Sequence, residues 1–311
     1  MPGPQLPRTT SGDVLVICTY YQDGAPDWGG LLQQIERGAL VPDGASVRLR
    51  PVADAGWDHL SGGQVPALLP PGGAAAPVAV LVDISGQYGW PLLVDLAAIP
   101  GRGVRVKTDL LGEAVTGLCD GTLVFDDLVR AMDARGAYRG DAGRPAFPTP
   151  TTPPPRAFPA LPAAAYEGAT LLVRTWFGDD DGWRALLAEL GGIDAEGWVG
   201  ADLDPDDIDV DDYPLTAMVV DDPGYAGLPP GAVPALLPPE GHTVLVLLAD
   251  AQTFAGPGRP LVAVDPDDTP GHVAVLPLRE AGSMACNLEI ANMDFADFVA
   301  VAGVRPWWEE A

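Results

Sequence analysis

One seven-residue sequence occurs twice in this chain, and the repetition limits the folds that the chain can adopt. Val65–Pro71 reads Val-Pro-Ala-Leu-Leu-Pro-Pro, and Val233–Pro239 repeats it letter for letter, 168 residues further on. The units of a solenoid recur at a spacing of roughly 20–50 residues. A single repeat at this much longer distance predicts two tandem domains of similar structure.

Other landmarks occur in the same order in both halves, which favours a duplicated domain over a chance match. The matched segments are Val14–Tyr21 with Leu171–Phe177, Val80–Asp83 with Leu247–Asp250, and Phe125–Leu128 with Phe295–Phe298. We therefore divide the chain into a flexible N-terminus (1–11), a first copy (12–139), a linker (140–165) and a second copy (166–311). The linker is rich in proline, which is typical of a semi-rigid spacer, although a docking motif for a proline-binding module is an alternative.

Short apolar runs and intervening amphipathic segments predict the same elements in each copy. The expected strands are 14–21, 47–52, 78–84, 92–96, 104–108, 170–175, 215–220, 243–248, 261–264 and 273–276. Helices are expected between the early strands and at the end of each copy, with Thr122 and Asn292 as the caps of the last ones. The predicted class is α/β, with a parallel β-α-β-α-β core and two shorter antiparallel strands in each mixed sheet.

The chain is strongly acidic, and the charge is uneven. The formal net charge is −26, of which −5 falls on residues 1–150 and −21 on residues 151–311. This balance argues against partners that need basic patches, namely nucleic acids and anionic membranes. It favours a basic protein partner for the second copy. Three unmatched cysteines, no apolar run long enough to span a membrane and no visible secretory signal predict a cytoplasmic protein.

Seven aspartates crowd into eleven residues of the second copy and form the candidate partner-binding segment. They are Asp202, Asp204, Asp206, Asp207, Asp209, Asp211 and Asp212. The segment begins like a helix-loop-helix calcium loop, but Asp207 stands where that loop needs glycine and Tyr213 where it needs glutamate. A solvated acidic loop that attracts a basic partner is the favoured interpretation.

Aspartates also follow the predicted strands, where ligands bind in parallel sheets. The candidate metal ligands are Asp179, Asp221, Asp222 and Asp250, with Asp23, Asp54 and Asp83 in the first copy. Converging carboxylates could hold Mg²⁺ or Ca²⁺. The alternative is that aspartates after strands cap helices and form turns. Catalytic residues are unknown, because no nucleophile with a paired base and acid is apparent in the sequence.

The second copy resembles an uncharacterised domain-of-unknown-function family of actinomycete-type bacteria. The resemblance depends on Leu171–Thr175, Val219–Leu228 and above all Asn287–Phe298, and it spans roughly residues 168–308. The first copy keeps the layout, but Gly117 stands for Asn287 and Thr122 for Asn292. The resemblance supports the domain and implies no chemistry.

Three hypotheses for function follow from these observations. The first is a non-enzymatic acidic interaction protein that binds a basic protein partner, as immunity-type proteins do. The second is a divalent-metal-dependent enzyme or sensor that uses the aspartates at strand ends. The third is a structural or scaffold component in which one copy has become a scaffold. A separate expectation is that the two copies can form an intramolecular pseudo-dimer.

Overall fold

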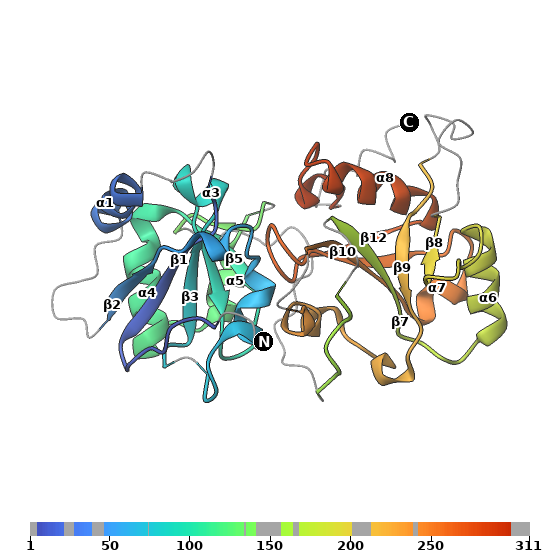
Figure 1. Cartoon of the computed structure of the whole chain (residues 1–311), viewed down its shortest axis with the longest axis horizontal. Helices are drawn as coiled ribbons and strands as arrows, with labels where there is room; N and C mark the ends of the chain where they lie inside the picture. The colour runs from blue at the N-terminus through green and yellow to red at the C-terminus, as the bar shows by residue number, and fades with distance from the viewer. Residues whose placement is uncertain are drawn as a thin grey trace.

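The computed structural model forms two lobes, one from each copy, that lie side by side along the long axis of the molecule (Figure 1). The structure describes residues 5–21, 28–38, 47–73, 75–133, 135–140, 157–163, 168–200, 213–238 and 242–299. Among these residues no helix has the length and apolar character needed to cross a membrane.

The first copy contains a six-stranded mixed sheet within the described residues, in the order β2-β1-β3-β4-β5-β6. Neighbours β2, β1 and β3 are parallel, β3-β4 and β4-β5 are antiparallel, and β5-β6 is parallel. The strands are β1 (Asp13–Cys18), β2 (Arg48–Val52), β3 (Val78–Val82), β4 (Leu92–Asp95), β5 (Gly103–Val106) and β6 (Ala137–Tyr138). Its helices are α1 (Trp28–Gly38), α2 (Val65–Leu68), α3 (Ile84–Gln87), α4 (Leu111–Asp120) and α5 (Phe125–Ala131).

The second copy repeats five of these strands in the same order and directions. Strands β9-β7-β10 are parallel, and β10-β11 and β11-β12 are antiparallel, with β8 added beside β9 in this copy. The strands are β7 (Ala169–Arg174), β8 (Trp198–Val199), β9 (Ala217–Val220), β10 (Thr243–Ala249), β11 (Leu261–Val264) and β12 (Val273–Leu276). Its helices are α6 (Asp180–Glu189), α7 (Ala251–Ala255) and α8 (Leu278–Glu289). The predicted fold class is therefore confirmed.

Short 3₁₀ turns fill the equivalent connections of the two copies. They are η1 (Ala55–Trp57), η2 (Gly62–Gln64), η3 (Thr108–Leu110), η5 (Pro223–Tyr225), η6 (Pro230–Ala232), η7 (Pro234–Leu236) and η8 (Phe295–Phe298). The helix expected over 231–237 is formed by two such turns, because prolines supply no amide for a continuous helix.

Each sheet is buried on both faces, which accounts for its nearly continuous apolar strands. In the first copy, one face packs against Leu111, Val115 and Phe125 of the helices. The opposite face packs against Trp57, Leu60 and the repeated seven-residue sequence. The second repeat covers the corresponding face of its own sheet through Val233 and Leu237. The repeated sequence thus closes the second face of each core.

Two segments predicted to lie outside the copies contribute to their cores. Leu6 is 2% exposed, and its amide donates to the carbonyl of Leu68. In the second copy, the amide of Leu161 donates to the carbonyl of Leu236 in the same way. Leu6 and Leu161 therefore belong to the repeating unit, and neither the N-terminal segment nor the linker is wholly outside it.

Candidate functional site

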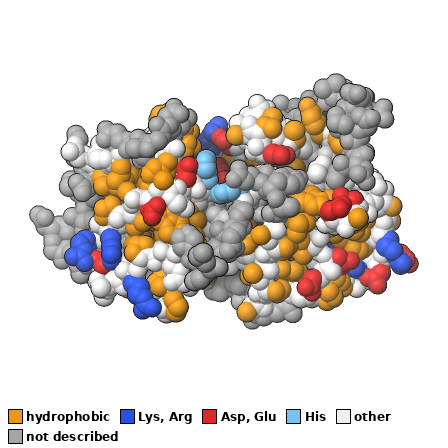
Figure 2. Space-filling view, in the orientation of Figure 1, with side chains coloured by type: hydrophobic (Ala, Val, Ile, Leu, Met, Phe, Trp, Pro, Cys, Tyr) orange, Lys and Arg blue, Asp and Glu red, His pale blue; other side chains and the backbone are white. Residues whose placement is uncertain are grey.

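A cleft of about 490 Å³ lies between the two copies. The first copy contributes the ends of β1 and β3 through Thr19 and Asp83, and the second contributes His242, Asp267 and Asp268. Figure 2 shows histidine and acidic side chains at the junction of the two lobes. The carboxyl ends of parallel strands are the usual position of ligand sites in such sheets, and here the other copy closes that edge.

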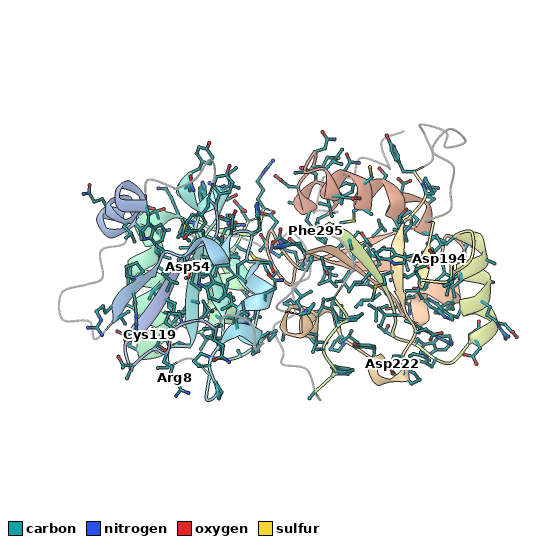
Figure 3. All side chains as sticks on the ribbon, viewed as in Figure 1. Arg8, Asp54, Cys119, Asp194, Asp222 and Phe295 are labelled. Atoms are coloured by element: carbon teal, nitrogen blue, oxygen red, sulfur yellow. The ribbon has the colours of Figure 1, made fainter. Side chains whose placement is uncertain are left out.

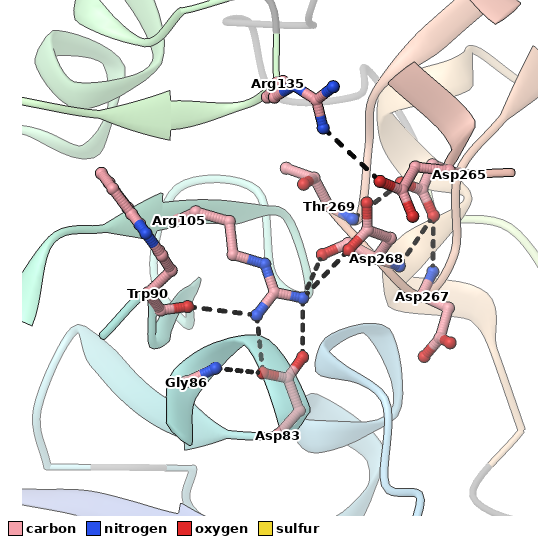
Figure 4. Close-up of polar contacts among 10 residues, drawn as sticks. Asp83, Gly86, Trp90, Arg105, Arg135, Asp265, Asp267, Asp268 and Thr269 are labelled. Carbon is pink, nitrogen blue, oxygen red and sulfur yellow. Dashed lines mark hydrogen bonds and ion pairs between the residues drawn. The ribbon is translucent and has the colours of Figure 1, made fainter. Parts of the chain in front are cut away.

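The guanidinium of Arg105 links the two copies at the wall of this cleft (Figure 4). It forms ion pairs with Asp83 at 2.6 Å and with Asp268 at 3.2 Å, and its side chain is 6% exposed. It also donates to the carbonyl of Trp90 at 3.3 Å and to that of Asp268 at 2.7 Å. Burial alone would lower the pKa of Arg105, but the Asp83 and Asp268 carboxylates raise it above its ordinary value. The cation is therefore permanently charged and tied to both copies.

Asp83 lies between the end of β3 and the start of α3. It accepts from the amide of Gly86 at 2.8 Å and is the N-cap of α3. A short side-chain acceptor satisfies one of the free amides of a first helical turn. Asp83 thus has two functions, as a cap within its own copy and as a partner for Arg105.

The loop between β11 and β12 holds the acidic side of the cleft in place. The buried carboxylate of Asp265 accepts from the amides of Asp267, Asp268 and Thr269 at 2.8, 3.0 and 2.7 Å. Burial and the charge of Asp268 raise the pKa of Asp265, while these amide hydrogen bonds oppose the rise. The resulting fixed turn directs the side chains of Asp267 and Asp268 toward the first copy.

The equivalent loop of the first copy uses the same hydrogen bonds with different side chains. Asp95 accepts from the amides of Ala97, Ala98 and Ile99 at 2.9, 2.9 and 3.0 Å. Ala97 and Ala98 occupy the places of Asp267 and Asp268. The loop conformation therefore belongs to the shared fold, whereas the two carboxylates are specific to the second copy.

Asp267 is the carboxylate of the cleft that lacks a partner. Among the described residues its side chain makes no hydrogen bond or ion pair, although solvent in the cleft reaches it. Its side chain is exposed to the cleft, while desolvation between the copies and the nearby charges of Asp268 and Asp83 raise its pKa to about 6. Asp83, Asp267 and Asp268 surround a single guanidinium, that of Arg105. Above a pH of about 6 this part of the wall therefore carries an excess of negative charge.

Two histidines from different copies meet at the cleft. The rings of His59 and His242 lie edge to face with centroids 6.0 Å apart, and His59 Nε2 is 3.5 Å from Asp58. His59 has a φ of +58°, and its amide donates to the carbonyl of Thr19. In the second copy Gly227 makes the same bond to Thr175 with a φ of +71°. The first copy therefore places a histidine where the backbone conformation favours glycine.

Direct contacts fix the two copies together around the cleft. The amide of Gly103 donates to the carbonyl of Pro270 at 2.8 Å, and Gln64 Nε2 donates to the carbonyl of Pro238 at 3.2 Å. Arg135 and Asp294 form an exposed ion pair at 3.6 Å. Through these contacts the two copies pack on each other.

The predicted metal ligands lie mainly at helix ends and do not converge. Three of them, Asp179, Asp222 and Asp250, cap α6, η5 and α7, because their carboxylates accept hydrogen bonds from backbone amides. Asp221 accepts from Trp183 Nε1 at 2.9 Å and pairs with Arg174 at 3.3 Å. Within the described residues, no group of three histidines, cysteines or acids is arranged to hold a metal ion.

The first copy repeats this capping. Asp54 accepts from the amide of Gly56 at 2.9 Å, as its counterpart Asp222 accepts from Gly224 at 2.7 Å. Figure 3 shows these two aspartates far apart, one in each copy. Asp23 lies outside the described residues, as do all seven aspartates of the acidic segment, namely Asp202, Asp204, Asp206, Asp207, Asp209, Asp211 and Asp212.

The two predicted caps, Thr122 and Asn292, are wrong. Thr122 bonds to Asp120, and Asn292 donates from Nδ2 to Asn287 Oδ1 at 2.7 Å. The following turns begin only at Phe125 and Phe295, so a cap at Thr122 or Asn292 would be too far from their free amides. Instead, the third residue of each element is an aspartate that accepts a hydrogen bond from the backbone amide of the residue before the element. Asp127 accepts from the amide of Val124, and Asp297 accepts from the amide of Asp294.

The predicted site residues did not include Arg105, Asp267, Asp268 or the pair of histidines. The one available signal was the shared Asp-x-x-x-x-Pro-Gly spacing of Asp95–Gly101 and Asp265–Gly271, within which only the second copy carries two further aspartates. That spacing indicates a common turn, but not what the turn faces.

Comparison with known proteins gives a family and no activity. A family model described as "Domain of unknown function (DUF6924)" matches residues 13–141 and again residues 169–305. No curated protein and no solved structure matches the chain. The two matched segments correspond to the two sheets and cover most of the sequence, so the chain belongs to the family of this domain of unknown function, DUF6924, and contains the domain twice.

Proposed function

We propose that this chain is a non-enzymatic binding protein for a basic protein partner, and that the cleft between its copies receives a cationic group of that partner. The observation that carries the proposal is the carboxylate of Asp267, unpaired among the described residues, in a cleft that four other carboxylates also line, those of Asp83, Asp268, Glu289 and Asp294, with the guanidinium of Arg105. Such a site attracts cations and repels anions.

The charge of the whole chain supports the same partner. The net charge of −26, concentrated in the second half, creates a field that raises the encounter rate with basic proteins. Neutralisation of a basic toxin by an acidic protein, as immunity-type proteins do, is a function of this kind. We propose a cytoplasmic setting, which is supported by the fact that all three cysteines are free thiols.

A blocked hexalysine peptide tests this proposal by calorimetry on the full chain. We expect saturable binding at an ionic strength of about 20 mM and at least a tenfold loss of affinity at about 300 mM, because added salt screens the attraction. A blocked hexaglutamate peptide is the control and should not bind. Absence of hexalysine binding at low ionic strength, or binding that ignores salt, would contradict the proposal.

A further inference from the structure

We propose that the cleft between the copies is a docking site for the ammonium group of one lysine side chain of the basic partner. This inference rests on the proposed function and identifies the cationic group and the residues that receive it. The wall of the cleft offers one free carboxylate, one unused hydroxyl and an apolar lining, and these match the three parts of a lysine side chain.

The carboxylate is Asp267. Asp83 and Asp268 already share the guanidinium of Arg105, with Asp83 held by both of its oxygens. Asp267 has no such partner among the described residues, so its charge is available to an incoming cation. The ammonium group of lysine is a compact charge with three rotatable donors, so it can bind this carboxylate and a separate acceptor at the same time.

The hydroxyl is that of Thr19, at the end of β1. Thr19 lines the cleft and is 3% exposed, and its Oγ1 is buried with no hydrogen-bond partner among the described residues. Its counterpart Thr175 donates to the carbonyl of Ala249 at 3.1 Å, so the equivalent hydroxyl of the second copy is satisfied. A buried polar group without a partner is costly, and an ammonium donor would satisfy it.

The lining of the cleft suits the carbon chain of a lysine. The apolar residues Leu60, Leu81, Leu92 and Val244 also line the cleft. Lysine packs its four-carbon stem against apolar surface while its charged end reaches polar partners. His59 and His242 stand beside this path, and the second copy has no equivalent pair because Gly227 occupies the position of His59.

The test uses blocked pentapeptides of glycine with one central residue, titrated into the isotopically labelled full chain and followed by chemical shift changes. The central residue is lysine, acetyl-lysine or arginine. We expect the lysine peptide to bind at millimolar concentration, the arginine peptide at least fivefold more weakly, and the acetyl-lysine peptide not at all. Equal responses to lysine and acetyl-lysine peptides, or no response to lysine up to about 10 mM, would overturn the inference.

Substitutions locate the binding within the cleft. We expect Asp267→Asn to weaken lysine binding at least tenfold and Thr19→Val to weaken it about threefold, because each removes one acceptor. The matched controls are Asp181→Asn, on the exposed face of α6, and Thr175→Val, at the satisfied hydroxyl; both should keep the affinity of the unaltered chain. Asp267→Glu checks that the charge at this position is what matters, and should restore most of the binding.

The pH dependence gives a readout that a purely structural role would not change. Binding of the lysine peptide should fall between pH 7.5 and pH 5, because Asp267, whose pKa is raised to about 6, gains a proton there. The charged and titratable groups that line the cleft with Asp267 include Asp83, Asp268, Arg105 and the two histidines. The Asp267→Asn chain isolates the contribution of this carboxylate, because its residual binding should vary less with pH.

The outcomes separate the inference from the proposed function. If hexalysine binds at low ionic strength and Asp267→Asn binds the lysine peptide as well as the unaltered chain does, the cleft is not the lysine site and the general binding function stands. If neither hexalysine nor the lysine peptide binds, both proposals fail. Melting temperatures of all variants within a few degrees of the unaltered chain show that the comparison concerns folded protein.

Discussion

The two copies use the carboxyl ends of their central strands in opposite ways. In the first copy this edge opens into the cleft and carries the hydroxyl of Thr19, which has no hydrogen-bond partner in the part of the chain that the structure describes. In the second copy the same edge is filled by Arg174, which lies 4.4 Å above the ring of Phe177 and 5.5 Å from that of Trp183. Trp176 also stacks on Phe254 with a centroid distance of 5.6 Å.

Each copy buries a guanidinium near this edge, but the two guanidinium groups pair with carboxylates in different parts of the molecule. Arg105 and Arg174 are each 6% exposed in their side chains. Arg105 pairs with Asp83 of its own copy and Asp268 of the other, whereas within the described residues Arg174 pairs with Asp180 and Asp221 of its own copy. The duplication thus produced one self-contained lobe and one lobe that needs its neighbour to complete a site.

Replacing Arg105 should have the largest effect of the changes considered. Arg105→Met leaves Asp83 and Asp268 without their shared cation, and we expect a loss of about 3 kcal/mol in the free energy of unfolding. Because Asp268 belongs to the other copy, the two lobes should also unfold less cooperatively. Denaturant unfolding followed by circular dichroism and tryptophan fluorescence measures both effects.

Arg174→Met is the matched control for this comparison. Its carboxylate partners are more exposed to water, at 73% and 42%, so the ion pairs contribute less and we expect a smaller loss of stability. The two lobes should still unfold with the same cooperativity as in the unaltered chain. Equal losses from the two substitutions, with no change in cooperativity from Arg105→Met, would break the proposed contrast.

Two glycines, Gly101 and Gly191, share a φ of +91°. Comparing substitutions at the two positions separates the effect of packing between the copies from the effect of backbone strain. A Cβ at Gly101 would lie 2.9 Å from the carbonyl carbon of Pro234 in the other copy, whereas at Gly191 it would meet nothing within 4 Å. Gly191→Ala should cost about 1 kcal/mol from backbone strain alone. Gly101→Ala should cost about 1 kcal/mol more, because backbone atoms at the interface must move apart. Thermal unfolding of the two variants gives the difference, and similar melting temperatures would show that the interface is looser than described.

Much of the fold could be predicted from the sequence, because the buried strands are almost wholly apolar and occur twice. The helices α4 and α8 were not predicted, since their packing depends on small residues. Gly282 lies against the backbone near Tyr213 and Gly117 against Leu123, and glycine in a helix reads as a break. The lengths of α4 and α8 therefore come from tertiary contacts that local propensity does not record.

The candidate site could not be predicted, because it exists only where the copies meet. Arg105 and Asp268 are 163 residues apart in sequence, and neither has a counterpart of the same type in the other copy. The predicted aspartates do lie at the carboxyl ends of the strands, and one of them, Asp83, lines the cleft. Four of them, Asp54, Asp179, Asp222 and Asp250, use their carboxylates to cap helical turns, which was the stated alternative to metal binding.

The matched aspartates Asp83 and Asp250 allow this capping role to be measured. They cap the short helices that follow the equivalent strands β3 and β10, and Asp83 also pairs with Arg105. We expect Asp250→Ala to lower the free energy of unfolding by about 1 kcal/mol through loss of the cap. Asp83→Ala should cost about 1 kcal/mol more, because it also leaves Arg105 with one partner fewer. Calorimetry with Mg²⁺ on Asp250→Asn checks the metal alternative, since saturable binding lost in this variant would make Asp250 a ligand as well as a cap.

The smallest expected effect concerns His59 and Gly227, which share one backbone conformation and differ in side chain. His59→Gly removes the strain of a left-handed histidine but adds freedom to the unfolded chain, so we expect a gain of only about 0.5 kcal/mol. Gly227→Ala should lose about 1 kcal/mol, because a Cβ there gains no contact within 4 Å and adds strain. The first substitution should also weaken binding of the lysine peptide, because it removes one wall of the cleft, and the second should leave that binding unchanged. Melting temperatures and the peptide titration together test whether the first copy tolerates strain in order to keep a side chain at the site. A His59→Gly chain that is less stable and binds the peptide normally would show that His59 serves the fold instead.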